Sequence, residues 1–139
     1  MNTHFTLSVI ANLDALRSPG MNRVPCVVFM DSLTKTKSHN PEHITRVLCD
    51  FLLAQWNFRT KEDDPALDEL ARSLFKRGLP ILKVSVPLQD NYIDCGFYCA
   101  RFAEEFLRVN PIITEVNITS QAIPGLGESM FNDRSIQVK

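Results

Sequence analysis

The sequence predicts one domain in which a small sheet packs with helices. Residues 4–11 alternate apolar and polar side chains, which is the two-residue period of a strand. Residues 24–30 form a short continuous apolar run, as expected for a strand that is buried on both faces. Three later stretches repeat apolar side chains every three or four residues, which is the period of a helix. A chain of 139 residues is long enough for one domain with a hydrophobic core.

The first two predicted strands are expected to pair with each other. Residues 12–23, which join them, carry Asn, Asp, Ser, Pro and Gly and predict a long connection. We therefore expect an antiparallel hairpin with an extended loop. Since one strand of such a pair starts where the other stops, His4 and Asp31 are expected to lie near the same end.

Two helices are predicted to follow the hairpin. The first begins between Ser38 and Pro41, because proline suits the first turn of a helix. The second begins at Asp63 or Asp64, with Pro65 in its first turn, and ends at Gly78, which suits a C-terminal cap. The apolar positions predicted for the two helices are Ile44, Val47, Leu48, Phe51, Leu52 and Trp56, and then Leu67, Leu70, Ala71, Leu74 and Phe75.

The last part of the chain predicts a third strand, a third helix and a tail. Residues 79–86 predict the strand, and the helix runs from about Asp94 to Val109. Residues 114–139 are expected to be a poorly defined tail, mostly loop, with a short helix beginning at Asn132 or Asp133. We treat residues 1–139 as a single domain. The apolar positions of the third helix are Tyr98, Cys99, Phe102, Phe106 and Leu107.

Composition and charge exclude several classes of function. Apolar residues make up 45% and charged residues 22% of the chain, which is ordinary for a soluble globular protein. The net charge of −1 does not indicate a nucleic-acid or membrane partner, and no apolar run reaches membrane-spanning length. Four cysteines are present, and we expect all four to be reduced, because the chain carries no pattern of an export signal.

Cys95 is the first candidate for chemistry, because it falls in the first turn of the third predicted helix. Helix N-termini carry backbone N–H groups without intrahelical partners and favour negative charge. A thiol there can have its pKa lowered from about 8.5 to roughly 3.5–7.5, and the thiolate is the nucleophile. Gly96, which follows, leaves room for the backbone of a substrate. Position alone nevertheless favours a small, buried and inert cysteine.

A nucleophilic thiol also needs a general base and a group that orients the base. His39 and His43 flank a helix start among polar neighbours, so we expect them on the solvated surface. His4 opens an apolar strand instead, so it is the candidate base. Asp31 is the candidate orienting group, although taken by itself the position slightly favours a residue of the turn that follows the strand, ahead of Ser32.

Gln89 lies six residues before Cys95, on the segment that leads to the third helix. Its side-chain amide and the Cys95 backbone N–H are candidate donors to the oxyanion of a tetrahedral intermediate. The alternative is an ordinary surface glutamine. A metal or redox site built on Cys95 and Cys99 is a third hypothesis, but a C-x₃-C spacing without a second pair of ligands supports it poorly. We expect no metal and no cofactor.

These residues together resemble the ubiquitin-like-protein-specific cysteine proteases, the Ulp/sentrin-specific family. The stretch VPLQDNYIDCG is similar to the active-site segment of that family, and FYCARFAEEFL is similar to the helix that follows it. His4 before a strand and Asp31 in VVFMDSL match the other two motifs, in the family's order of His, Asp and Cys. The resemblance covers roughly residues 3–113, and the 12–23 connection resembles the branch with larger inserts.

The resemblance implies an α+β fold of the papain-like cysteine protease type. It implies hydrolysis of the bond after the C-terminal diglycine of SUMO or a related modifier, with SUMO and its conjugates as partners, in the nucleus and/or the cytoplasm. It leaves open whether precursors or conjugates are the main substrates. The alternative is an inactive remnant of the same fold that only binds a ubiquitin-like protein.

The resemblance also assigns roles to single residues. Cys95 is expected to be the nucleophile, His4 the base and later the acid, Asp31 the orienting group and Gln89 the oxyanion donor. The residues expected to bind substrate are Phe5, where the family usually has Trp, together with Asn91 and Gly96. Domains of the family carry a substantial segment before the histidine. We therefore expect this chain to be part of a larger catalytic domain, without its N-terminal part.

Overall fold

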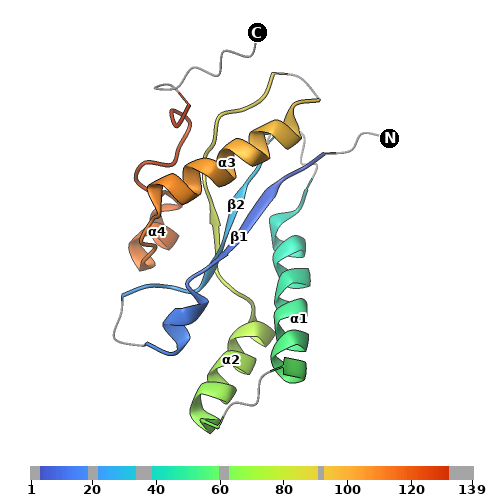
Figure 1. Cartoon of the computed structure of the whole chain (residues 1–139), viewed down its shortest axis with the longest axis vertical. Helices are drawn as coiled ribbons and strands as arrows, with labels where there is room; N and C mark the ends of the chain where they lie inside the picture. Colours follow the sequence, from blue (N-terminus) through green and yellow to red (C-terminus); the bar gives the residue numbers. More distant parts are fainter. Residues whose placement is uncertain (1–3, 19–21, 34–38, 60–62, 91–92, 132–139) are drawn as a thin grey trace.

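The computed structural model describes residues 4–18, 22–33, 39–59, 63–90 and 93–131. Within these ranges a three-stranded sheet is surrounded by four α-helices and one 3₁₀-helix, so the α+β class is confirmed (Figure 1). None of the described helices is long and apolar enough to cross a membrane. Ser38, Asn91 and the helix predicted from Asn132 or Asp133 lie outside the described residues.

The sheet has the order β1, β2, β3, with β2 in the centre. Strands β1 (Leu7–Ala11) and β2 (Cys26–Met30) pair antiparallel, with Leu7 opposite Met30, so the predicted hairpin is confirmed. A short 3₁₀-helix, η1 (Leu13–Leu16), forms inside the connection that was predicted as a loop. Strand β3 (Ile81–Lys83) pairs parallel with β2 and is shorter than predicted, because only these residues form the ladder.

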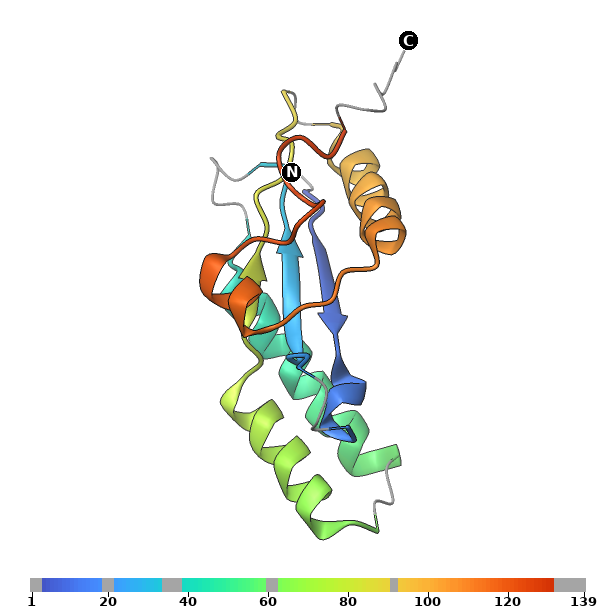
Figure 2. The same cartoon turned by 90° about the vertical axis from the view of Figure 1, so that its left-hand side faces the viewer.

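Strand β2 is buried on both faces, as its unbroken apolar run predicts. On one face Cys26, Val28 and Met30 pack with Phe102 of α3 (Cys95–Val109). On the other face Val27 packs with residues of α1 (Pro41–Arg59) and α2 (Pro65–Arg77). The sheet is therefore a central layer, and Figure 2 shows α3 on one side of it.

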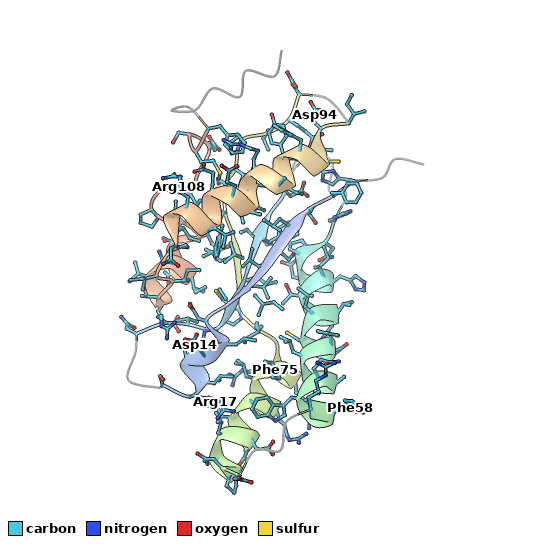
Figure 3. The ribbon with its side chains drawn as sticks, in the orientation of Figure 1. Asp14, Arg17, Phe58, Phe75, Asp94 and Arg108 are labelled. Carbon is cyan, nitrogen blue, oxygen red and sulfur yellow. The ribbon has the colours of Figure 1, made fainter. Side chains whose placement is uncertain are left out.

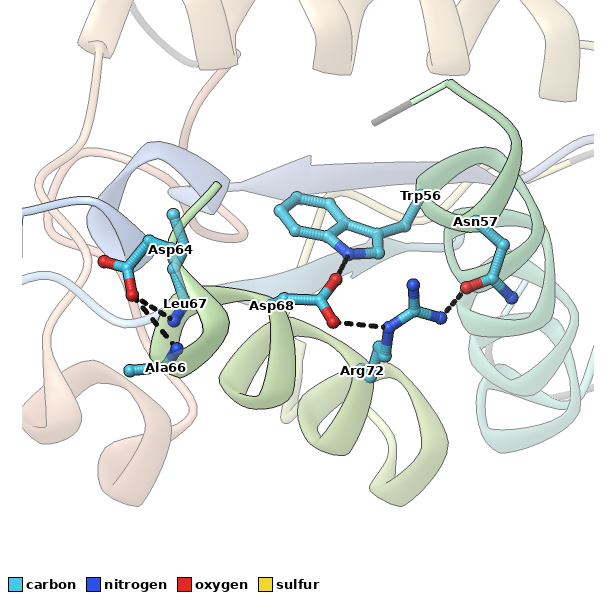
Figure 4. Close-up of polar contacts among 7 residues, drawn as sticks. All are labelled: Trp56, Asn57, Asp64, Ala66, Leu67, Asp68 and Arg72. Carbon is cyan, nitrogen blue, oxygen red and sulfur yellow. Dashed lines mark hydrogen bonds and ion pairs between the residues drawn. The ribbon is translucent and has the colours of Figure 1, made fainter. Parts of the chain in front are cut away.

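Helix α2 begins and ends where local chemistry predicts. Asp64 is the N-cap, and its carboxylate accepts hydrogen bonds from the backbone N–H groups of Ala66 at 3.0 Å and Leu67 at 3.3 Å (Figure 4). Gly78 ends the helix with a φ of 104°, a conformation that glycine adopts without strain. Helix α1 likewise begins with the predicted proline, Pro41.

A polar cluster ties the end of α1 to α2. The Trp56 indole donates to Asp68 Oδ1 at 2.8 Å, and Arg72 Nε donates to Asp68 Oδ2 at 2.9 Å (Figure 4). Arg72 also donates to the side-chain oxygen of Asn57. The hydrogen bonds from Arg72 and then Trp56 lower the pKa of the Asp68 carboxyl. The pair of helices is thus held by directed contacts as well as by apolar packing.

Four side chains of the predicted apolar stripes are exposed instead of buried. They are Val47 and Phe51 of α1, Leu70 of α2 and Leu107 of α3. Helical spacing marks one side of a helix, but the neighbouring elements cover only the middle of that side. In α1 this middle is occupied by Thr45 and Cys49, which are both buried.

Residues 115–120 form a helix, so the loop predicted there is wrong. Helix α4 (Glu115–Ser120) starts with a reciprocal capping box between Thr114 and Asn117. The prediction missed it because an asparagine takes the place that Glu or Gln usually has in this motif. Further along, Ile123 and Leu126 are buried in the same core cluster as Phe102.

We expect Phe102→Ala to destabilise the fold by about 3–5 kcal/mol, because it leaves a cavity where the ring packs. Phe102 is completely buried between α3 and the sheet, and its ring stacks on Phe131 with centroids 5.8 Å apart. Urea unfolding measures the change. Leu107→Ala on the same helix is the control, and it should change stability by no more than about 0.5 kcal/mol, because Leu107 is 77% exposed. Equal losses in the two variants would contradict the assigned core.

Candidate active site

Four segments of the chain meet at one end of the molecule. Since β1 runs antiparallel and β3 parallel to β2, this end holds the start of β1 and the ends of β2 and β3. The start of α3 lies at the same end, as Figures 1 and 2 show. His4, Asp31, Gln89 and Cys95 each belong to one of these four segments. The topology therefore gathers all four candidates that sequence reasoning selected.

His4 and Asp31 are in direct contact. His4 Nε2 lies 2.6 Å from Asp31 Oδ1, and the two side chains are only 7% and 6% exposed. If the ladder register is continued past Leu7 and Met30, His4 and Asp31 become diagonal neighbours on one side of the hairpin. Asp31 Oδ1 also accepts a hydrogen bond from the Leu33 backbone N–H at 2.8 Å. Antiparallel pairing thus brings the two residues together, as expected.

The contact with Asp31 determines which nitrogen of His4 can act as a base. An ionised carboxylate only accepts hydrogen bonds, so Nε2 carries the proton of the neutral ring and Nδ1 carries the lone pair. Nδ1 is buried and has no hydrogen-bond partner among the described residues. Buried polar atoms are rarely left in this state. An acceptor that is buried, oriented and unoccupied is suited to take a proton from a neighbouring reactive group.

Cys95 is the first residue of α3, where the sequence places it. Its side chain is buried, with 3% exposure, but the following residue, Gly96, is exposed, so the thiol lies just beneath the surface. Asp94 stands at the N-cap without a capping hydrogen bond from its side chain; Figure 3 shows it at the end of the helix. Because Cys95 opens α3, the positive end of the helix dipole lies at this cysteine.

The thiol of Cys99 lies near the same groups and responds to their charges. Its pKa is raised to about 11, first by burial and then by the negative charges of Cys95 and Asp31. One helical turn after Cys95, this side chain thus lies within electrostatic reach of the end of β2. Burial alone raises the pKa of Cys26 to about 11. All four cysteines are free thiols.

Gln89 is buried, so the alternative of a surface glutamine is wrong. Its backbone N–H donates to the carbonyl oxygen of Ser32 at 3.1 Å, and its side-chain oxygen Oε1 accepts a hydrogen bond from Ser32 Oγ. Ser32 directly follows Asp31 and is also buried. The segment after β3 is therefore attached to the end of β2 through one serine.

His39 also reaches the site, although the sequence predicts it on the solvated surface. Its Nδ1 and Thr6 Oγ1 form a hydrogen bond of 2.9 Å, and its ring centroid lies 5.1 Å from that of His4. The prediction failed because nothing local shows that the chain returns past the start of β1 before α1 begins. His43 is exposed, as predicted.

Phe5 and Gly96, two of the three expected substrate-binding residues, lie side by side. A Cβ atom built on Gly96 would be 3.9 Å from Phe5 Cδ2, an ordinary van der Waals distance, and it would meet no other atom of the described residues outside its chain neighbours and its own helix within 4 Å. Gly96 also does not need a positive φ. The fold itself therefore does not require glycine at this position. Asn91, the third residue, lies outside the described residues.

A hollow of about 480 Å³ opens beside Asp31 and His39 on the side of α1. It is lined by Phe29, Asp31, His39, Asn40, Pro41, Glu42, Lys83 and Val84. Since Cys95, Gln89 and His4 do not line it, this hollow borders Asp31 and His39 but not the thiol. The described residues contain no cluster of three or more His, Cys, Asp or Glu side chains that could hold a metal ion.

Comparison with known proteins finds relatives of one kind. "Probable ubiquitin-like-specific protease 2B" of Arabidopsis thaliana is 27% identical over 117 residues, which cover 80% of this chain and 12% of that protein. "Sentrin-specific protease 6" of Mus musculus is 27% identical over 95 residues, covering 68% of this chain and 7% of the relative. "Sentrin-specific protease 7" of Homo sapiens is 29% identical over 93 residues, which cover 67% of this chain and 8% of that protein.

The chain thus spans about a tenth of the length of these relatives. No family profile and no solved structure matches it. The relatives nevertheless agree with one another in kind, and their kind is the one that the motifs around His4, Asp31 and Cys95 resemble. The α+β fold places these motifs at one end of the molecule. In sequence the chain is similar to the ubiquitin-like-protein-specific, or Ulp/sentrin-specific, cysteine proteases, at 27–29% identity over part of their length.

Proposed function

We propose that this chain carries the catalytic centre of a thiol peptidase that hydrolyses the bond after the C-terminal diglycine of SUMO or a related modifier. Cys95 is the nucleophile, His4 the general base and acid, and Asp31 the orienting group. The observation that carries the proposal is the buried hydrogen bond between His4 Nε2 and Asp31, with Nδ1 left without a partner among the described residues. The names of the relatives support the class of substrate.

The first half of the reaction forms a thioester. His4 Nδ1 takes the proton of the Cys95 thiol, and the sulfur attacks the carbonyl carbon of the last glycine of the modifier. The π electrons of the carbonyl move to its oxygen, which becomes an oxyanion. The Gln89 amide and the Cys95 backbone N–H donate hydrogen bonds to this oxyanion. As the intermediate collapses, the C–N bond breaks and His4 gives its proton to the leaving amine.

The second half releases the modifier. His4 takes a proton from a water molecule, and the resulting hydroxide attacks the thioester carbon. The C–S bond then breaks, and the Cys95 sulfur leaves with the electron pair and takes the proton back from His4. The modifier departs as a carboxylic acid, which loses its proton to solvent and becomes a carboxylate. Throughout the cycle Asp31 keeps Nδ1 directed at the reacting groups and stabilises the imidazolium that forms twice.

The diglycine of the modifier fits the surroundings of the thiol. Phe5 is 56% exposed and lies against the position of Gly96, so the two residues border the surface above Cys95. A substrate segment without side chains passes such a border more closely than any other. Because the fold does not itself require glycine at position 96, we attribute the missing side chain to the approach of the substrate backbone.

Cys95→Ser is expected to lower the rate of cleavage more than about 10³-fold, because it removes the nucleophile. The assay is release of a fluorophore joined to SUMO through its C-terminal diglycine. Cys99→Ser, one turn later on the same helix, is the matched control and should cleave at nearly the wild-type rate, as should Cys26→Ser and Cys49→Ser. Wild-type cleavage by the Cys95→Ser variant would rule out the assignment.

A modifier that carries an electrophile in place of its last carboxylate separates an enzyme from a binding remnant. Peptide mass mapping should find the modifier joined covalently to Cys95. If the folded chain bound the modifier without forming this bond, the inactive remnant would be the correct function.

Gly96→Ala is expected to lower kcat/KM about 10²-fold while the melting temperature stays the same, because the added methyl group meets the substrate and not the fold. Gly127→Ala is the matched control, since a Cβ there also has open space around it and no positive φ is needed. The two variants are compared in the fluorogenic assay and by thermal unfolding. Undiminished kcat/KM in Gly96→Ala would exclude a close approach of substrate at this residue.

Cys99 is expected to resist alkylation at neutral pH. Its pKa of about 11, against an ordinary value of 9.0, leaves about a hundredfold less thiolate than an unperturbed cysteine has. Labelling of the wild-type chain with iodoacetamide at pH 8, followed by peptide mass mapping that distinguishes Cys99 from Cys95, measures the rate while both charges that raise this pKa are present. Adding Asp31→Asn should speed the labelling, because the Asp31 charge helps to raise the pKa. Labelling of Cys99 as fast as that of a free thiol would contradict the arrangement.

A further inference from the structure

We propose that Ser32 is a positioning residue that holds the side chain of Gln89 in the orientation required of an oxyanion donor. This inference rests on the proposed function, since it concerns the same site. It adds a residue that the sequence analysis did not select as a candidate.

Two hydrogen bonds join Ser32 to Gln89 across 57 positions of the chain. The Ser32 carbonyl oxygen accepts from the Gln89 backbone N–H at 3.1 Å, and the Ser32 hydroxyl donates to Gln89 Oε1. Both residues are buried, Ser32 at 1% exposure and Gln89 at 7%. The first bond places the backbone of Gln89, and the second acts on its side chain alone.

The second bond matters because an amide side chain has two unlike ends. One end accepts hydrogen bonds through Oε1, and the other donates them through Nε2. Only the donor end stabilises an oxyanion, whereas the acceptor end repels it. A hydroxyl that donates to Oε1 favours the orientation in which Oε1 faces Ser32, so that Nε2 lies at the opposite end of the amide plane.

The burial of Ser32 supports a specific role for its hydroxyl. A buried hydroxyl without a partner is unfavourable, so a polar side chain at 1% exposure needs one in the protein. Gln89 Oε1 is such a partner. Because Ser32 directly follows Asp31, the end of β2 then holds both parts of the site, the histidine through Asp31 and the oxyanion donor through Ser32.

A double-mutant cycle tests the role. Gln89→Ala should lower kcat about 10²–10³-fold by removing one oxyanion donor. Ser32→Ala should lower kcat about tenfold with KM unchanged, because the donor remains but is no longer held. If Ser32 acts only through Gln89, the double variant should be no slower than Gln89→Ala. Ser85→Ala, at an exposed position, is the matched control and should leave kcat unchanged.

Two further readouts separate positioning from general damage. Iodoacetamide alkylates Cys95 without forming an oxyanion, so its rate should be the same in Ser32→Ala and the wild type. The second readout is the NMR spectrum of ¹⁵N-labelled protein, in which the side-chain amide signals of Gln89 are identified by their loss in Gln89→Ala. These signals should shift in Ser32→Ala and stay in place in Ser85→Ala. If Ser32→Ala does not fold, Ser32→Cys replaces it, since a thiol is a weak donor of similar size and kcat should still fall.

The outcomes distinguish this inference from the proposed function. If the wild-type chain does not hydrolyse the substrate, the proposed function is wrong and the catalytic role of Ser32 is wrong with it. If the wild type is active but the effects of Ser32→Ala and Gln89→Ala multiply, or kcat of Ser32→Ala is unchanged, only the role of Ser32 is overturned. Unshifted Gln89 amide signals in Ser32→Ala would likewise overturn it.

Discussion

The antiparallel pairing of β1 with β2 is the constraint on which the rest of the structure depends. Its register, Leu7 opposite Met30, determines which residues meet just beyond the strands, and there His4 contacts Asp31. A slip of one residue would turn every side chain of β1 to the other face of the sheet. The register is strongly specified because β2 is buried on both faces and packs into a core cluster on each of them.

The site is a small polar region at the edge of a hydrophobic core. His4, Asp31, Ser32 and Gln89 are held by hydrogen bonds to one another or to the backbone. Such bonds are stronger away from water, and a buried polar atom without a partner is correspondingly unfavourable. Among these four residues, only His4 has such an atom: its Nδ1 is buried and has no hydrogen-bond partner among the described residues. In the proposed function, His4 Nδ1 takes the proton of the thiol while the groups around it are already oriented.

Much of the local structure could be predicted because its causes lie within a few residues. Pro41, Asp64, Pro65 and Gly78 mark the helix ends through preferences of the backbone itself. Burial was harder to predict, since Val47 and Leu107 have helical spacing yet are exposed. The length of β3 and the existence of α4 were missed for similar reasons: β3 depends on how far β2 can pair with it, and the cap of α4 uses an uncommon residue.

The sequence by itself determined the hairpin of β1 and β2 and the helices α1, α2 and α3, and with them the set His4, Asp31, Gln89 and Cys95. Periodicity, capping and turn chemistry act between near neighbours in the chain, and they suffice to place these four at segment ends. Only the tertiary structure decided that His39 lies against His4 and that Ser32 binds Gln89. Those contacts join residues far apart in the chain, and they exist because the sheet, the helices and the returning segments pack together at one end.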